Sequence, residues 1–130
     1  MERILSLFKN QIFYIATVDG DQPHVRPFGR LLGYQGGIYL NTGSTKSVYR
    51  QMKANPKVEL CTFSKGAIIR VTAQVMESDD PDIRKIMLEE EPGIANMYKG
   101  RENSLAVFQL THMETVVTER GEETQRFTLE

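Results

Sequence analysis

The sequence predicts a single, mainly β (α+β) domain whose antiparallel sheet curls or closes into a barrel. Three observations lead to this prediction. The 130 residues suffice for one hydrophobic core but are too few for two domains. About seven or eight short stretches have strand character, against about three or four short helix patterns. Tight turn signals such as Asp19-Gly20-Asp21 and Gly36-Gly37 join the stretches, which favours antiparallel pairing.

The strand patterns are rich in β-branched and aromatic residues and are bounded by glycine, proline and aspartate. The charged C-terminal stretch is included, because Phe127 and Leu129 alternate with polar residues and so favour an edge strand over disorder. The expected strands cover 12–18, 23–32, 38–41, 58–63, 67–77, 104–111, 113–119 and 124–128.

The helix patterns are short and have recognisable ends. Ser44 is expected to cap the second helix and Pro56 to stop it, while Asp80 precedes a proline at the first position of the third. The expected helices are 2–9, 45–54 and a third that runs from Pro81 to Pro92-Gly93.

Composition excludes several classes of partner. Sixteen basic residues balance 17 acidic ones, and no long basic run breaks the net charge of −1, so a nucleic-acid partner is not expected. No apolar run approaches the roughly 20 residues that span a bilayer, and the N-terminus lacks the pattern of a signal peptide. The expected location is therefore the cytoplasm, with no membrane contact.

Residues suited to acid–base or metal chemistry are scarce. The single cysteine, Cys61, lies in a strand pattern and is expected to be buried and inert. The two histidines, His24 and His112, form no pair at metal-ligand spacing, so no metal site is expected. No nucleophile motif is present either, and the catalytic residues remain unassigned.

The most informative stretch runs from Tyr39 to Tyr49, where a strand leads through Thr-Gly-Ser-Thr into a helix. A helix start presents unpaired N–H groups, Gly43 allows close approach of a ligand, and Lys46 adds a full charge. Those features suit a phosphate group. The alternative is a plain helix cap with a solvated lysine.

A second stretch, His24 to Arg30, contains two arginines four residues apart. In an extended strand, Arg26 and Arg30 point to the same face, which favours an anionic or electron-rich partner. Pro27 cannot donate a ladder hydrogen bond and so indicates an edge or a bulge. The alternative is a pair of surface arginines on a solvated sheet.

From end to end, the chain resembles the pyridoxamine 5′-phosphate oxidase-like family of FMN-binding split barrels. The likeness is strongest to small members with no assigned substrate. The stretches that carry it are Phe13 to Pro23, Val25-Arg26-Pro27-Phe28, Thr42 to Val48, Asn55 to Leu60, and Ile69-Arg70-Val71-Thr72-Ala73.

The resemblance implies a six-stranded antiparallel split barrel with short flanking helices, formed by residues 1–130 as one domain. It also implies a homodimer with FMN at the subunit interface. The residues expected beside the flavin ring and ribityl chain are Arg26, Pro27, Phe28, Gly29 and Arg30, and those expected at the phosphate are Thr42, Gly43, Thr45, Lys46 and Ser47. The other subunit is expected to complete the site near Ile69, Arg70 and Tyr98.

The function implied is that of an FMN-dependent oxidoreductase acting on an unidentified small molecule. A non-enzymatic flavin carrier or redox sensor is the main alternative. Haem, a deazaflavin, or a barrel that binds nothing are further alternatives. Relatives often have a tryptophan just before the Ile-Arg-Val strand, where this chain has Ala67 and Ile68, so the resemblance does not define the substrate.

Overall fold

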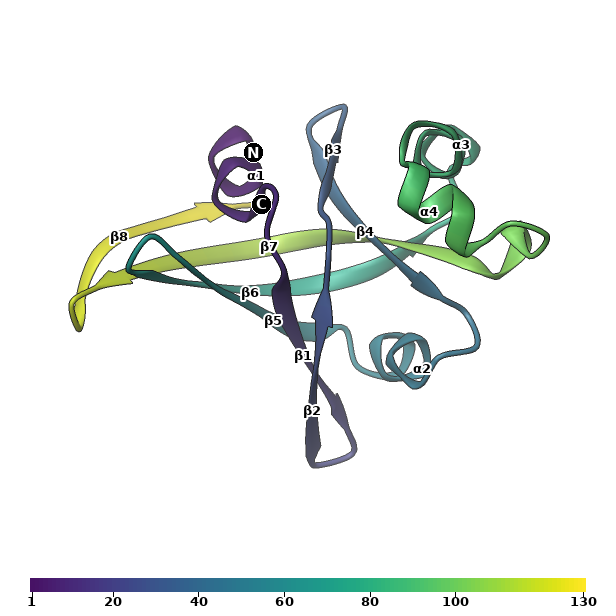
Figure 1. Ribbon diagram of the computed structural model, residues 1–130. Coiled ribbons are helices and arrows are strands. Elements are labelled where there is room, and N and C mark those ends of the chain that lie inside the picture. The colour runs from purple at the N-terminus through teal and green to yellow at the C-terminus, as the bar shows by residue number, and fades with distance from the viewer.

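In the computed structural model, which describes residues 1–130, eight strands form one antiparallel sheet (Figure 1). They follow the order β2-β1-β5-β6-β7-β4-β3, and β8 pairs with β7. Their bounds are β1 Phe13–Asp19, β2 Gln22–Phe28, β3 Leu32–Tyr34, β4 Gly37–Gly43, β5 Lys57–Ser64, β6 Ala67–Ser78, β7 Leu105–Glu119 and β8 Glu122–Leu129.

The strands curl around one core, and β2 and β3, at the two ends of the strand order, are not paired with each other. This is a split barrel, as expected, but the expected six strands are too few. A short strand at 32–34 adds to β4, and the C-terminal residues return along β7. Buried side chains alternate along β1, β4, β5 and β6, and the core includes Phe13, Ile15, Ile38, Leu40, Leu60 and Phe108.

The outer face of the sheet keeps large apolar side chains in solvent. The register places Tyr14 opposite Cys61 and Phe63 opposite Ile68, and Val25 lies opposite Ala16. Phe63 is 69% exposed, and Tyr14, Val25 and Ile68 are also exposed. A contiguous apolar patch of this kind is typical of an interaction surface.

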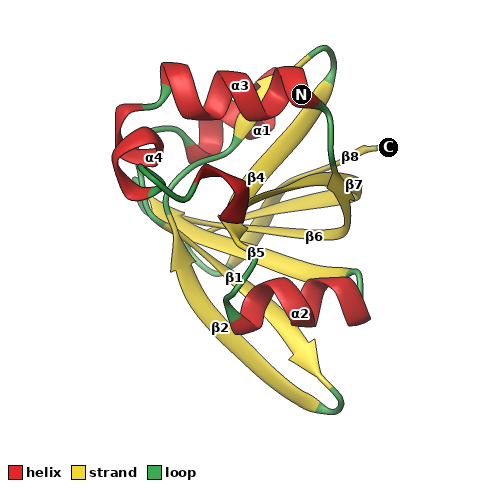
Figure 2. Cartoon of the chain, turned by 90° about the vertical axis from the view of Figure 1, so that its right-hand side faces the viewer, coloured by secondary structure: helices red, strands yellow, loops and turns green.

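Four α-helices flank the sheet: α1 Glu2–Phe8, α2 Ser47–Ala54, α3 Pro81–Glu90 and α4 Pro92–Met97. The structure confirms Asp80 as the cap of α3, because its carboxylate accepts a hydrogen bond from the Asp82 amide at 2.9 Å. Figure 2 shows α2 near β1 at one end of the molecule and α3 and α4 grouped at the other. No helix is long and apolar enough to cross a membrane.

Two expected boundaries are wrong. The second helix begins at Ser47 rather than at residue 45, and Lys46, not Ser44, occupies its N-cap position. Strand β4 continues to Gly43 because its backbone stays paired with β7, which delays the turn into the helix. Pro92 and Gly93 end α3 but also begin α4, since proline suits the first position of a helix.

The two strands expected at 104–111 and 113–119 are one long strand, β7. A bulge replaces the expected break: the pairing with β6 shifts between Thr72 and Gln74, and His112 has a φ of 51°. Between these paired positions β7 has one residue more than β6, and this extra residue bends β7 without reversing its direction.

Strand β2 lies at the edge of the sheet, as Pro27 predicted. Pro23 and Pro27 both lie in this strand, where one side needs no ladder hydrogen bond. Cys61 is only half-buried, on the outer face, because its strand position points away from the core. Burial nevertheless raises the pKa of its thiol.

Candidate functional site

A hollow of about 210 Å³ opens where the ends of β2 and β4 meet the start of α2 and the last turn of α4. Backbone segments from four elements converge there, so side chains far apart in sequence share one small space. The residues that line it are Pro27, Phe28, Gly29, Arg30, Asn41, Thr42, Lys46, Ile94, Met97 and Tyr98.

The start of α2 borders this hollow through Lys46, which gives the hollow an electropositive edge. The backbone N–H groups of Thr45, Ser47 and Val48 donate to no backbone carbonyl, whereas that of Lys46 donates to Gly43 at 3.1 Å. Lys46 itself has no carboxylate partner within ion-pair distance. Free N–H groups, a helix start and an unpaired ammonium group together suit an anion.

Gly43 is packed closely between the two sides of the hollow. A Cβ atom on Gly43 would lie 3.4 Å from Tyr98 Oη and 3.6 Å from Lys46 Cγ. Tyr98 is buried, and this burial raises the pKa of its phenol, although the charge of Arg101 acts in the opposite direction. The Tyr98 side chain therefore forms a fixed, uncharged wall.

Arg26 points beneath α2 rather than into the hollow. Its guanidinium donates to Thr17 Oγ1 and to Gln51 Oε1, each at 2.7 Å, and to the carbonyl of Ile15 at 3.3 Å. Burial lowers the pKa of Arg26, and no carboxylate neutralises it. The result is a positive charge held by neutral acceptors beneath α2.

Arg30 follows the end of β2 and lies at the rim of the hollow. Its Nη2 atom is 2.7 Å from Oε2 of Glu91, the residue between α3 and α4. Arg26 and Arg30 therefore do not share a face, because β2 ends at Phe28 and the extended parity ends with it.

A comparison with protein families identifies the fold's relatives. The family model for pyridoxamine 5′-phosphate oxidase matches residues 2–116 of the chain. The chain belongs to the pyridoxamine 5′-phosphate oxidase family. The resemblance inferred from the sequence is thus confirmed, whereas no curated protein matches the chain.

Solved structures with the same fold superpose along nearly the whole chain. A NimC/NimA family protein from Clostridium acetobutylicum is 37% identical, with a TM-score of 0.91, over 99% of this chain and 93% of that one. A pyridoxamine 5′-phosphate oxidase-like protein from Listeria innocua is 19% identical, with a TM-score of 0.67, over 98% and 96%. An FAD-binding protein from Mesorhizobium loti is 15% identical, with a TM-score of 0.61, over 92% and 96%.

The structure gathers six of the ten expected cofactor residues in the hollow of this family member, namely Pro27, Phe28, Gly29, Arg30, Thr42 and Lys46. Gly43 lies directly behind them. Arg26 and Thr45 do not line the hollow, and Ser47 lines a different one, of about 350 Å³, between α2 and the β1–β2 turn.

The three residues expected where a second subunit completes the site lie in three different parts of the chain. Ile69 is a core residue, 1% exposed, so it has no surface to offer a partner. Tyr98 lines the hollow of its own chain. Arg70 is exposed on the outer face, where its Nη2 lies 2.7 Å from Glu59 Oε2.

Sequence reasoning missed Asn41, Ile94 and Met97. Asn41 directly precedes the Thr-Gly pair at the end of β4, so strand alternation does not mark it. Ile94, Met97 and Tyr98 have the spacing of one helix face, which was a usable signal for α4. The expected stop at Pro92-Gly93 concealed it.

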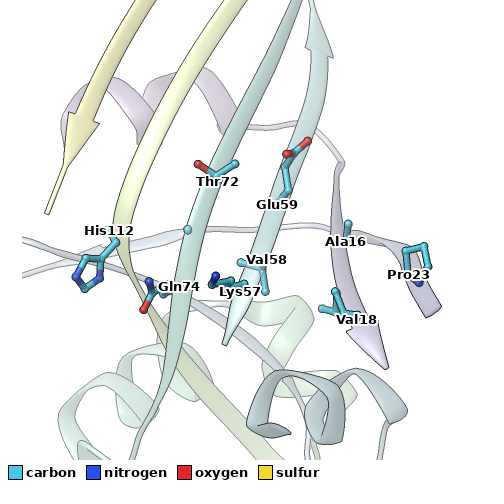
Figure 3. Close-up of a pocket in the computed structure, with 11 residues that line it drawn as sticks. Ala16, Val18, Pro23, Lys57, Val58, Glu59, Thr72, Gln74 and His112 are labelled. Carbon is cyan, nitrogen blue, oxygen red and sulfur yellow. The ribbon is translucent and has the colours of Figure 1, made fainter. Parts of the chain in front are cut away.

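A larger hollow, of about 410 Å³, lies on the outer face beside the bulge in β7 (Figure 3). Its floor consists of strand residues such as Ala16, Val58 and Ala73, and Lys57, Glu59 and His112 stand at its edges. None of the ten expected cofactor residues lines it.

Proposed function

We propose that this protein binds FMN between two copies of the chain and uses it to oxidise or reduce a small molecule. The observation that carries the proposal is the start of α2, where three free backbone N–H groups lie next to an unpaired Lys46. Membership of the pyridoxamine 5′-phosphate oxidase family and the FAD-binding relative from Mesorhizobium loti support a flavin as the ligand.

The phosphate of FMN fits the electropositive edge of the hollow. Lys46 would supply a charged donor, and Thr42 a hydroxyl from the end of β4. Gly43 has no side chain to separate the ligand from the backbone, and the space near it is bounded by Tyr98 and Lys46. Arg26 would add positive charge from beneath α2, without direct contact in this arrangement.

The flat ring of the flavin would lie partly in the remainder of the hollow. Pro27 and Phe28 form one side, and Met97 and Tyr98 the other. A bound flavin supplies the redox chemistry by exchanging hydride or electrons with the substrate. The role left to the chain is to bind and orient, which suits a hollow lined by no histidine and no carboxylate.

A second copy of the chain would complete the site. The hollow of about 210 Å³ is smaller than the roughly 300–1,000 Å³ usual for small-molecule pockets, so it would enclose only part of a flavin. The exposed Tyr14, Val25, Phe63 and Ile68 supply an apolar surface of the kind that pairs in homodimers.

The test is the visible absorption spectrum of the purified protein, followed by titration of the flavin-free protein with FMN. We expect one FMN for each chain, and an affinity for riboflavin at least about tenfold weaker, because riboflavin lacks the phosphate. Parallel titration with FAD distinguishes the two nucleotides. A protein that ignores all three flavins refutes the proposal, and tight FMN binding without turnover of any donor favours a flavin carrier or redox sensor.

A further inference from the structure

The rim of the hollow carries an ion pair that changes which molecules can enter it. Arg30 and Glu91 are 2.7 Å apart, and the Glu91 side chain is only 16% exposed, whereas that of Arg30 is 52% exposed. A carboxylate shielded in this way interacts more strongly with its partner than one in free solution. Pro92 follows Glu91 and begins α4, which restricts the backbone at this point.

The charges around the hollow balance once the cofactor is counted. Lys46 and Arg30 are the only charged residues that line it. In the proposed function, Lys46 serves the FMN phosphate. Arg30 is neutralised by Glu91, so no cation is left to hold an anionic group on the substrate.

The remaining wall of the hollow is apolar. Ile94 and Met97 of α4 line it, and Met97 is 53% exposed. Glu91 lies immediately before this helix, so the ion pair and the apolar wall belong to one segment. Burying an unpaired anion against such a wall is costly.

We propose that Glu91 determines substrate specificity: by holding Arg30, it excludes anionic molecules and reserves the space over the flavin for an uncharged, largely apolar substrate. The inference rests on the proposed function, because it assigns Lys46 to the cofactor. It predicts that removing the charge of Glu91 converts Arg30 into a receptor for anions.

The test compares benzamide with benzoate, two flat rings of nearly the same shape that differ by one charge. Their binding to the FMN-loaded protein is followed by the change in the visible flavin spectrum. The protein is expected to prefer benzamide. In Glu91→Gln, we expect benzoate affinity to rise about tenfold, while benzamide affinity changes less than about twofold.

Arg30→Gln is the matched variant and has the opposite effect. It leaves the Glu91 carboxylate without a partner, so benzoate is expected to bind even more weakly than to the unaltered protein. In the double variant, the tenfold gain is expected to disappear. The proposal is overturned if a variant changes the affinities for benzoate and benzamide by the same factor, or if Glu91→Gln leaves the preference for benzamide over benzoate unchanged.

Failure of the proposed function is recognised separately. The FMN titration of each variant is recorded first, and absence of flavin binding in the unaltered protein refutes that function on its own. The preference between benzoate and benzamide is then measured on flavin-free protein by ligand-observed NMR. Without FMN, Lys46 contributes equally to benzoate binding in every variant. A preference between benzoate and benzamide that stays the same when the Glu91 charge is removed therefore still overturns the proposal.

Discussion

Two of the hollows in this molecule differ in chemistry as well as in size. The one beside the start of α2 is about 210 Å³, and the one on the outer sheet face is about 410 Å³. The smaller collects the ends of strands and helices, where backbone N–H groups are free. The larger is floored by strands whose backbone groups are mostly paired with their neighbours. An unpaired lysine at a helix start, rather than volume, makes the smaller hollow the better candidate for a charged ligand.

Phe63→Asp gives the sharpest test of the outer face, because we expect a second copy of the chain, rather than the ligand, to cover that surface. The substitution would bury a carboxylate twice in a twofold interface, and self-association is expected to weaken on the order of 100-fold or more. Sedimentation velocity over a range of concentrations measures this. Gln35→Asp, in the exposed β3–β4 turn, adds the same charge elsewhere and is expected to leave self-association unchanged.

The double variant Lys46→Ala with Thr42→Ala tests the smaller hollow directly. Each lost charge-assisted contact contributes on the order of 1.5–3 kcal/mol, so FMN affinity is expected to fall at least about tenfold. Lys57→Ala removes a lysine from the edge of the larger hollow and serves as the matched control in the same fluorescence titration. If Lys57→Ala weakens FMN binding and the double variant does not, the assignment of the two hollows is reversed.

Gln51→Leu breaks the support beneath α2. Arg26 and Thr17 both donate to the Gln51 side-chain oxygen, and Gln51 is 8% exposed, so losing this acceptor is expected to cost about 1–3 kcal/mol of unfolding free energy. The urea midpoint measures the loss. Gln51→Glu retains an acceptor and is expected to keep the stability. Its carboxylate would however neutralise Arg26 and weaken FMN binding, so unchanged FMN affinity in Gln51→Glu removes Arg26 from the proposed site.

Among these substitutions, Glu77→Gln has the smallest expected effect, and that effect is on stability. Burial acts to raise the pKa of this carboxyl, but hydrogen bonds from Lys53 and Tyr49 of α2 outweigh it and hold the pKa below its ordinary value. A carboxyl with a lowered pKa in the folded state stabilises it above the ordinary pKa of about 4.3. That contribution is lost as the pH falls through the folded-state pKa. The melting-temperature gap between the unaltered protein and Glu77→Gln is therefore expected to be constant near neutrality and to close in acid. A gap independent of pH would contradict this account.

Local patterns predicted most of the sheet and part of the candidate site. The strands expected at 12–18 and 58–63, and the Asp80-Pro81 helix start, follow from neighbouring residues alone, and the structure confirms them to within one residue at each end. The Thr-Gly pair and Lys46 were found in the same way, and they lie together as predicted.

The errors came from features that depend on distant contacts. The long strand β7 passes through His112 because β6 pairs with it on both sides of the bulge, which no local signal at 111–113 shows. The parity that placed Arg26 beside Arg30 failed because Thr17 and Gln51, from other elements, offer Arg26 its acceptors. Contacts with other elements of the fold decide both cases.

The prolines of β2 also affect how the protein behaves when many copies are crowded together. An open strand edge is a template on which another chain can add a strand and begin a fibril. Pro23 and Pro27 have no N–H group, so at these two positions the β2 edge offers an incoming strand no donor. The two prolines of this edge strand therefore also protect it from growing into an aggregate.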